Sequence, residues 1–348
     1  MSNLWSQLVR ELEPYVPGEQ PRDREFVKLN TNENPYPPSP EVAKQIQAFA
    51  TDSLRRYPDP NSQALKDCLA ITFALQNDQV FVGNGSDEVL AFAFMAFFKQ
   101  SKSLLFPDIT YSFYTVYCDL FEISYQQIPL GDEFNIDVSA YNQPNGGVIL
   151  ANPNAPTGIA LALAAIETLL QANSESVVLI DEAYVDFGAD SAVQLINRYP
   201  TLLVVQTLSK SRSLAGIRLG YALGNPELIA ALERVKNSFN CYPIDSIANV
   251  SAIAALDDQP YFETTCQKII ADRDWFTSEL QAEGFSVLPS KANFVFATHP
   301  ELEAKQLYES LKKKGVLVRY FSKPRINQFL RITIGTRDEL EALLAALP

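Results

Sequence analysis

The sequence contains very little histidine and cysteine. Its 348 residues include a single histidine, His299, and four cysteines, Cys68, Cys118, Cys241 and Cys266. No two cysteines stand in a CxxC pair, and their spacings match no zinc motif. We therefore expect no metal site and no Ser-His-Asp triad. Because nothing indicates a disulfide framework, a reducing, cytoplasmic location is the default expectation.

Long apolar runs and an excess of positive charge are also absent. The apolar segment 89–98 (VLAFAFMAFF) is too short to span a membrane and indicates a buried helix. Residues 1–13 lack the basic start and apolar run of a secretory signal. The 28 Lys and Arg against 41 Asp and Glu give a net charge of −13, which argues against a nucleic-acid or anionic membrane partner. An anionic small substrate would need a local cluster of arginines or lysines.

The overall composition is that of a globular protein. Hydrophobic residues make up 47% and charged residues 20%, which excludes disorder, collagen and coiled coil for the chain as a whole. At roughly 100–200 residues per domain, the length allows about two domains. Such a chain can bury roughly three-quarters of its surface, enough to enclose a ligand cleft.

Continuous apolar runs alternate with helical segments in the middle of the chain. Residues 147–151 (GVILA), 177–180 (VVLI) and 202–207 (LLVVQT) are such runs, and residues 162–172 and 192–199 between them have helical patterns. Strands of this kind are buried on both faces, as in a parallel sheet covered by helices, so the fold class is α/β. Other elements are expected upstream: helices at 41–50, at 61–76 and from Ser86, and strands at 79–85 and 103–107.

The pattern changes at both ends of this region. Residues 14–40 are rich in proline and asparagine and predict an extended arm with turns. After a loop at 238–245, the pattern predicts a smaller α+β domain, with helices at 246–256, 260–282 and 337–346 and strands at 285–288, 293–297 and 328–334. We expect an N-terminal arm over residues 1–40, a large domain over 41–238 and a small C-terminal domain over 239–348.

Polar clusters follow the apolar strands. NPNAPTG (152–158), DEAY (181–184) and LSK (208–210) each come directly after one of the three runs. A fourth cluster, GNGSDE (83–88), follows a strand and opens a helix. Open α/β sheets bind ligands beyond the carboxyl ends of their strands, and free N–H groups at a helix start face anions such as phosphate.

Each cluster also has an ordinary structural interpretation. GNGSDE is a capped helix start with Ser86 as the N-cap. Asp181 can cap the next helix, and NPNAPTG can be a turn with a cis X-Pro bond. Lys210 alone is a solvated surface lysine, and Tyr111 alone is a core aromatic. The functional interpretation depends on their conjunction.

Together the clusters fit the chemistry of pyridoxal phosphate. This cofactor needs a lysine for its Schiff base, an acid facing the pyridinium nitrogen, donors for the phenolic oxygen and a cup for the phosphate. Lys210 is the candidate catalytic lysine, Asp181 the acid, and Tyr111 can stack on the ring. The phosphate cup would be formed by Gly85, Ser86, Asp87, Ser209 and Arg218.

These motifs resemble a known family. GNGSDE, DEAY and TLSKSRSLAGIRLGY (207–221) resemble the pyridoxal-phosphate aminotransferases related to aspartate aminotransferase. PYVPG (14–18), LNTNENPY (29–36) and GNGSDE are most similar to the histidinol-phosphate aminotransferases. The resemblance implies a mostly parallel seven-stranded sheet and the interconversion of histidinol phosphate and 2-oxoglutarate with imidazole-acetol phosphate and glutamate. An aromatic-amino-acid aminotransferase or a threonine-phosphate decarboxylase on the same scaffold is the alternative.

The resemblance also implies individual roles. Tyr184 contacts the phenolic oxygen, and Tyr57 reaches the cofactor phosphate of the other subunit, which requires a homodimer with shared active sites. Arg331 binds the anionic group of the substrate. The further substrate contacts that it implies are Tyr15, Asn34, Asn293 and Arg319.

One position departs from the superfamily pattern. The asparagine that usually precedes Pro-Thr-Gly and donates to the phenolic oxygen is replaced here by Ala155. Asn154 stands one residue earlier, and we expect it to reach the oxygen through a shifted loop.

Overall fold

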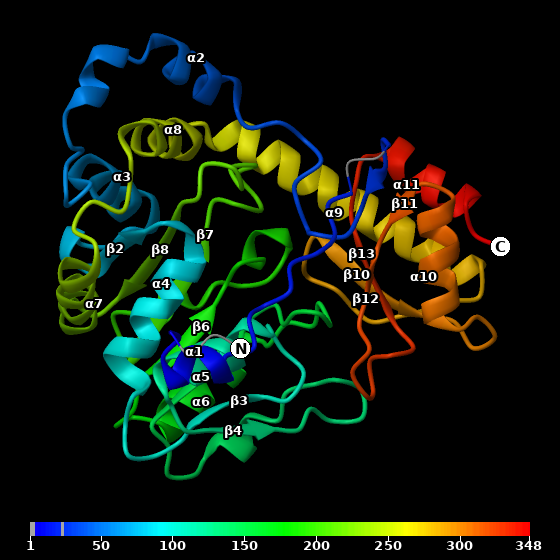
Figure 1. Cartoon of the computed structure of the whole chain (residues 1–348), viewed down its shortest axis with the longest axis horizontal. Helices are drawn as coiled ribbons and strands as arrows, with labels where there is room; N and C mark the ends of the chain where they lie inside the picture. Colours follow the sequence, from blue (N-terminus) through cyan, green and yellow to red (C-terminus); the bar gives the residue numbers. More distant parts are fainter. Residues whose placement is uncertain (1–3, 22–23) are drawn as a thin grey trace.

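The computed structural model describes residues 4–21 and 24–348. Figure 1 shows a larger body and a smaller body, joined by the long helix α9 (Gln259–Ala282) that runs from one to the other. The larger body holds a seven-stranded sheet, and the smaller body a four-stranded sheet. The predicted α/β class is confirmed.

The large sheet is mostly parallel. Its strand order is β2-β8-β7-β6-β5-β3-β4, and only β8 runs antiparallel to its neighbours. The strands are β2 (Val80–Gly83), β3 (Leu104–Pro107), β4 (Tyr125–Ile128), β5 (Gly147–Ala151), β6 (Val178–Asp181), β7 (Leu202–Thr207) and β8 (Gly220–Gly224).

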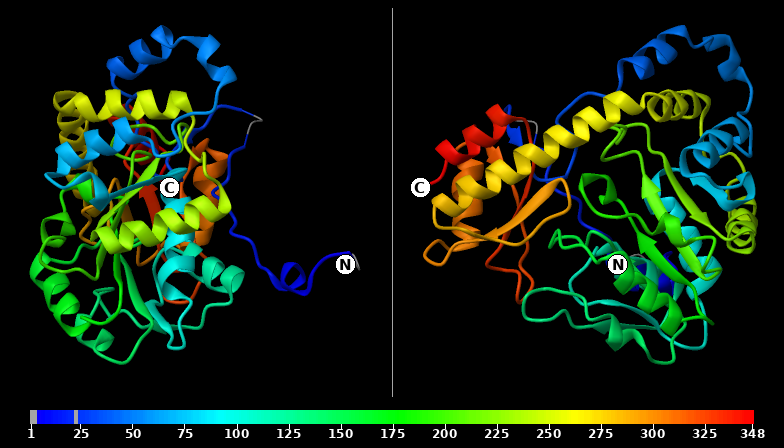
Figure 2. Two further views of the ribbon diagram at one scale, coloured as in Figure 1. Left: turned by 90° about the vertical axis from the view of Figure 1, so that its left-hand side faces the viewer. Right: turned by 180° about the vertical axis from the view of Figure 1, so that it is seen from behind.

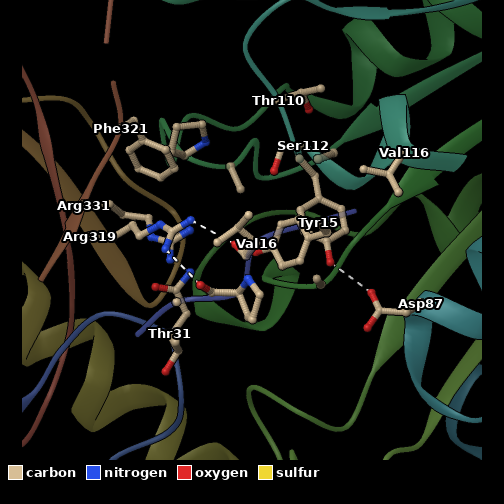
Figure 3. A pocket seen from close by; sticks show the side chains of 18 of the residues that line it. Tyr15, Val16, Thr31, Asp87, Thr110, Ser112, Val116, Arg319, Phe321 and Arg331 are labelled. Carbon is tan, nitrogen blue, oxygen red and sulfur yellow. Dashed lines mark hydrogen bonds between the residues drawn. The ribbon is translucent and has the colours of Figure 1, made fainter. Parts of the chain in front are cut away.

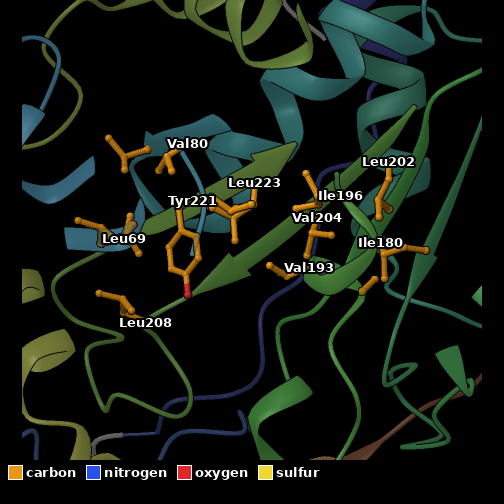
Figure 4. Packing of buried hydrophobic residues seen from close by; sticks show 14 of the residues in the cluster. Leu69, Val80, Ile180, Val193, Ile196, Leu202, Val204, Leu208, Tyr221 and Leu223 are labelled. Atoms are coloured by element: carbon orange, nitrogen blue, oxygen red, sulfur yellow. The ribbon is translucent and has the colours of Figure 1, made fainter. Parts of the chain in front are cut away.

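Helices cover both faces of this sheet, which is why the central strands β5, β6 and β7 are buried at every position. On one face, Ile180 and Val204 pack in a cluster with residues of helices α2, α3, α6 and α8 (Figure 4). On the other face, Leu179 and Leu203 pack with residues of α4, α5 and α7. These helices are α2 (Pro40–Ala48), α3 (Gln63–Phe73), α4 (Gly85–Ala93), α5 (Phe113–Phe121), α6 (Leu163–Ala172), α7 (Pro226–Phe239) and α8 (Ser246–Asp257).

The small body is an antiparallel sheet with helices against it. The strand order is β12-β13-β10-β9, and its core includes Ile269, Val295, Leu307 and Ile332. Its elements are β9 (Ser286–Val287), β10 (Phe294–Thr298), α10 (Ala304–Lys313), β11 (Val316–Leu317), β12 (Arg319–Tyr320), β13 (Leu330–Thr333) and α11 (Arg337–Ala345).

The N-terminal arm is partly built into the small body. Residues 14–40 were expected to form no strand, but β1 (Val27–Lys28) pairs in parallel with β11. Helix α1 (Gln7–Glu11) has no buried residue, and it projects from the body in Figure 2. The division at residues 40 and 238 stays a prediction. Among the helices of the described residues, none is both long and apolar enough to cross a bilayer.

The structure also differs from the sequence expectations in one short helix and one strand. The short helix expected over residues 192–199 is a 3₁₀ helix that covers only Ala192–Leu195. Strand β8 (GYALG) was not predicted because it begins and ends with glycine, which strands disfavour. Its five residues are all buried between β2 and β7, and this tertiary environment outweighs the local preference.

Gly220 on β8 allows the start of α4 to approach the sheet. A Cβ at this position would lie 2.3 Å from the Ser86 backbone nitrogen and 2.5 Å from the Gly85 carbonyl carbon. Any side chain on Gly220 would therefore push the GNGSDE segment away from the sheet. Gly216, in contrast, is exposed, and a Cβ added to it would have nothing within 4 Å.

We expect Gly220→Ala to lower the free energy of unfolding by about 1–3 kcal/mol, because the overpacked backbone must shift. The matched control, Gly216→Ala, should stay within about 0.5 kcal/mol of the parent protein. Urea denaturation of both variants measures the difference. Equal stability of the two variants would contradict the close approach.

Candidate active site

A cavity of about 850 Å³ lies between the large and small bodies. It opens at the carboxyl ends of the parallel strands, where ligands of open α/β sheets bind. Volumes of this size are typical of cofactor and substrate sites. Of the residues singled out in the sequence, those that line it are Tyr15, Ser86, Asp87, Tyr111, Asp181, Tyr184, Ser209, Lys210, Arg218, Arg319 and Arg331.

Lys210 reaches the cavity from the turn after β7. Its Nζ donates to the carbonyl oxygen of Thr31 over 3.2 Å. The Lys210 backbone is held by Asn34, whose Nδ2 donates to the carbonyls of Lys210 (3.0 Å) and Ser211 (3.2 Å). Burial lowers the pKa of the Lys210 amine to about 8, and the nearby Arg331 guanidinium contributes in the same direction. The amine is therefore far easier to deprotonate than an ordinary lysine.

Asp181 ends strand β6 and is almost completely buried. The Tyr114 hydroxyl donates to its Oδ2 over 2.8 Å, and the Ala183 backbone N–H to its Oδ1 over 3.3 Å. Burial raises the pKa of this carboxyl to about 6, while the Tyr114 hydrogen bond opposes the shift. The carboxylate is thus mostly ionised at neutral pH and can face a protonated ring nitrogen.

An anion-binding cup lies at the start of α4. Gly85 has φ +79°, and a Cβ there would lie 2.7 Å from Nη2 of Arg218. Arg218, itself at φ +57°, forms an ion pair with Asp87 at 3.2 Å. The Tyr111 hydroxyl donates to the other Asp87 oxygen over 3.0 Å. The guanidinium and the first N–H groups of the helix make this corner suitable for phosphate.

Two arginines from the small body form a second cationic region (Figure 3). Arg331 on β13 donates through Nη2 to the Asn30 carbonyl over 2.9 Å, and its buried Nε has no partner among the described residues. Arg319 on β12 lies within 3.3 Å of the Val16 carbonyl and 3.5 Å of the Pro17 carbonyl. An unpartnered buried guanidinium nitrogen is costly unless a ligand accepts from it, so Arg331 is suited to bind an anion.

The N-terminal arm contributes to the same cavity. Residues 13–18 line it, and the Tyr15 ring lies 4.9 Å from that of Phe113 and 6.3 Å from that of Tyr111. Figure 3 shows Tyr15 and Val16 between the two arginines and Asp87. The arm therefore spans the region between the two anion-binding regions.

The structure places five of the predicted residues outside the cavity lining. Gly85 packs directly against the Arg218 guanidinium, and Asn34 donates to the Lys210 backbone carbonyl. Asn293 is fully buried and donates through Nδ2 to the Asn32 carbonyl over 3.0 Å. Tyr57 is 82% exposed and stacks on Tyr242 with ring centroids 4.7 Å apart. The fifth is Asn154.

Asn154 does not turn toward the cavity as expected. Its Nδ2 donates to the Ile109 carbonyl (3.0 Å) and to Thr157 (3.1 Å), and its Oδ1 accepts from Thr110 over 2.8 Å. The amide of this 1% exposed residue is thus committed to the loop, whose two X-Pro bonds at Pro153 and Pro156 are cis. Ala155 lines the cavity instead and offers only a methyl group.

Several site residues were not found from the sequence. Tyr114, the hydrogen-bond donor to Asp181, lies in an aromatic helix whose pattern only indicates burial. Asn32 donates to the Tyr184 hydroxyl over 3.0 Å across 152 residues of chain. Lys323 lines the cavity from an irregular segment. The contacts of Tyr114 and Asn32 have no local sequence signal, because the partner of each is set by the tertiary fold.

The residues present fit pyridoxal phosphate. A buried amine of lowered pKa and an ionisable buried carboxyl line one cavity, as the aldehyde and the ring nitrogen require. The cup at α4 supplies a guanidinium and helix N–H groups for the phosphate. The cavity also has room for a substrate beside the cofactor.

Comparisons with known proteins agree with this geometry. Residues 24–347 match the family model for aminotransferase class I and II. A histidinol-phosphate aminotransferase of Acinetobacter baumannii (strain SDF) is 60% identical, over 99% of this chain and 96% of its own length. Histidinol-phosphate aminotransferase 1 of Hydrogenovibrio crunogenus is 58% identical, over 100% of this chain and 98% of its own.

Solved structures show the same fold. The histidinol-phosphate aminotransferase from Sinorhizobium meliloti, in complex with pyridoxal-5′-phosphate, superposes with a TM-score of 0.90 at 24% identity and covers 100% of this chain and 97% of its own. The corresponding enzyme from Clostridium acetobutylicum has a TM-score of 0.85 at 26% identity, over 92% of this chain and 97% of its own.

The lowered pKa of Lys210 predicts how the cofactor-free protein reacts with pyridoxal phosphate. Only the neutral amine attacks an aldehyde, so the rate should rise roughly tenfold per pH unit below about pH 8 and level off above it. Stopped-flow measurement of the visible absorbance between pH 6 and 10 tests this, with Lys210→Ala as the blank. A rate that keeps rising to pH 10, as for a solvated lysine, would contradict the burial effect.

Proposed function

The chain belongs to the class I and II aminotransferase family, and from this premise we propose that it interconverts histidinol phosphate and 2-oxoglutarate with imidazole-acetol phosphate and glutamate. It is a pyridoxal-phosphate-dependent transferase of histidine biosynthesis, as its relatives' names indicate. The observation that carries the substrate assignment most directly is the buried Arg331, whose Nε has no partner among the described residues. It lies beside Arg319, across the cavity from Asp87, which is the ion-pair partner of Arg218.

These two arginines suit a phosphorylated substrate. A phosphate monoester carries close to two negative charges at pH 7, and the guanidinium fork matches its oxygens. The chain as a whole carries −13, so this cationic region is a local exception rather than part of a basic surface. Histidinol phosphate has no carboxylate, whereas 2-oxoglutarate does, and the same arginines can hold either anion in its half-reaction.

The roles of the protein groups follow from their positions. Pyridoxal phosphate, when bound, supplies an electron-withdrawing ring that stabilises negative charge at the substrate Cα. The ionised Asp181 keeps the ring nitrogen protonated, and Tyr184 donates to the phenolic oxygen. Ser86, Ser209 and Arg218 hold the phosphate.

Lys210 carries the proton in this account. As a neutral amine it would remove the proton from the substrate Cα, and as the resulting ammonium it would hold this proton for return on the other side of the transferred nitrogen, where the bound cofactor would supply the carbon that keeps the amino group. Its lowered pKa makes the neutral form accessible near physiological pH. Because the amino group resides on the enzyme between two substrates, the kinetics should be ping-pong.

A half-reaction screen tests the substrate. Histidinol phosphate should remove the visible absorbance of the holoenzyme, and 2-oxoglutarate should restore it, whereas phenylalanine and threonine phosphate should react at least about 100-fold more slowly. Lys210→Ala should abolish both changes, and Lys99→Ala, at an exposed lysine outside the cavity, should abolish neither.

Two outcomes of this screen would overturn the assignment. Faster turnover of phenylalanine would favour an aromatic-amino-acid aminotransferase. Release of carbon dioxide from threonine phosphate would favour a decarboxylase.

We also propose a homodimer with shared sites. Tyr57 lies outside the cavity of its own chain and is 82% exposed, with its ring stacked on that of Tyr242. Exposed aromatic side chains of this kind would be covered if a second copy packed against them. Tyr57 would then reach the phosphate cup of the partner.

Because the four cysteines are free thiols, we also propose a cytoplasmic location.

Mixed dimers test whether Tyr57 acts in the other subunit. Tyr57→Ala and Lys210→Ala should each lose most activity as homodimers. A mixed dimer of the two should regain activity, because one of its sites combines an intact Lys210 with an intact Tyr57 from the other chain. Size-exclusion chromatography with light scattering verifies the dimers. Inactive mixed dimers would place Tyr57 in its own chain's site, and a fully active Tyr57→Ala homodimer would place it in neither.

A further inference from the structure

The amide group of Asn32 has a fixed orientation. Asn32 is 1% exposed and follows β1, with φ +57°. Its backbone N–H donates to the Thr333 hydroxyl oxygen over 3.0 Å, and that hydroxyl donates to Asn32 Oδ1 over 3.0 Å. In the flipped orientation Nδ2 would donate to the Thr333 oxygen, and the hydroxyl proton of Thr333, a residue only 2% exposed, would lose its one acceptor among the described residues; Oδ1 therefore faces Thr333 and Nδ2 faces Tyr184.

This orientation determines the direction of the hydrogen bond to Tyr184. An amide nitrogen only donates, so the Tyr184 oxygen accepts from Nδ2 at 3.0 Å. The Tyr184 hydroxyl proton is therefore left for another acceptor, and it is donated to none within residues 4–21 and 24–348. Burial raises the pKa of Tyr184, so the hydroxyl keeps this proton at neutral pH.

The free proton lies in the part of the cavity next to the catalytic lysine. Lys210 Nζ is 5.8 Å from the centre of the Tyr184 ring, and both residues line the cavity. In pyridoxal phosphate the phenolic oxygen stands on the ring carbon adjacent to the one whose aldehyde reacts with the lysine. A donor beside the lysine is thus placed to serve that oxygen.

Nearby side chains leave this task to Tyr184. Ala155 contributes a methyl group to the cavity, and the amide of Asn154 is committed to Ile109, Thr157 and Thr110. The hydroxyl of Tyr184 therefore matters more here than it would beside a second donor. A residue that fixes the direction in which the Tyr184 hydroxyl donates its proton therefore also influences the charge on the phenolic oxygen.

We propose that Asn32 is a positioning residue that aims the Tyr184 hydroxyl proton at the phenolic oxygen of the cofactor. The inference rests on the proposed function and adds to it a residue that touches neither cofactor nor substrate. It acts by occupying the acceptor site of Tyr184, so that the tyrosine can only donate into the cavity.

Asn32→Asp reverses the bond, and its effect can be read spectroscopically. The carboxylate would accept the Tyr184 proton, the phenolic oxygen would lose its donor, and the extra negative charge there would hold the proton on the adjacent nitrogen more firmly. The pH midpoint of the holoenzyme's visible band should rise by about one unit, and Tyr184→Phe should shift it in the same direction by a similar amount.

A double-mutant cycle separates this effect from simple charge. In a Tyr184→Phe background, Asn32→Asp should shift the pH midpoint of the visible band by less than about half as much as it does in the parent protein. Asn30→Asp is the charge-matched control, because Asn30 is 2% exposed in the same segment but its Nδ2 donates to the Glu19 carbonyl instead. Its shift should be the same with and without the Tyr184 hydroxyl.

The outcomes distinguish the inference from the function it rests on. If Asn32→Asp does not fold, Asn32→Ser should give a smaller upward shift that also disappears with Tyr184→Phe. Equal shifts in both tyrosine backgrounds, or no shift in either Asn32 variant, would overturn the positioning role and leave the aminotransferase intact. A parent protein that develops no visible band with pyridoxal phosphate would instead refute the proposed function.

Discussion

The common register of β5, β6 and β7 is the constraint on which the site depends. Ala151 pairs with Asp181, and Asp181 with Val205, so the three strands approach one edge of the sheet together. β7 continues to Thr207, and the turn after it carries Lys210. The apolar core on both faces fixes this register, because a slip of one residue would turn every side chain of a strand to the wrong face. Packing far from the cavity therefore places an amine and a carboxyl at the same edge.

The N-terminal arm then connects the reactive groups of the two bodies. Its segment between β1 and α2 accepts hydrogen bonds from Arg331 at Asn30 and from Lys210 at Thr31, and donates to Tyr184 from Asn32. It also holds the Lys210 backbone through Asn34. Because β1 pairs with β11, a movement of the small body relative to the large sheet would change the lengths of all of these hydrogen bonds. Arg331, the proposed substrate-binding residue, and Lys210, the proposed proton carrier, thus both donate hydrogen bonds to one short stretch of chain.

Local patterns predicted the parts of the fold that depend on local chemistry. The apolar runs identified β5, β6 and β7, and the polar clusters after them lie at the cavity, because strand ends and helix starts are encoded within a few residues. Asn34 and Asn154 were expected at the cofactor or substrate but bond to backbone and loop groups instead, since the partner of an amide depends on what the tertiary fold brings beside it. β8 and the partners of Asp181 and Tyr184 were missed for the same reason. The role predicted for Tyr57 depends on how two copies of the chain assemble, and the pattern of a single chain does not encode that assembly.

A crystal structure of the protein with pyridoxal phosphate is the most direct test of the central claim that one sheet edge brings residues 181, 210 and 218 around a single ring. We expect continuous density from Lys210 Nζ to the cofactor, the ring nitrogen within hydrogen-bonding distance of the Asp181 carboxylate, and the Arg218 guanidinium on the phosphate. A cofactor bound elsewhere, or a ring whose nitrogen faces away from Asp181 while Lys210 stays on the Thr31 carbonyl, would contradict the account.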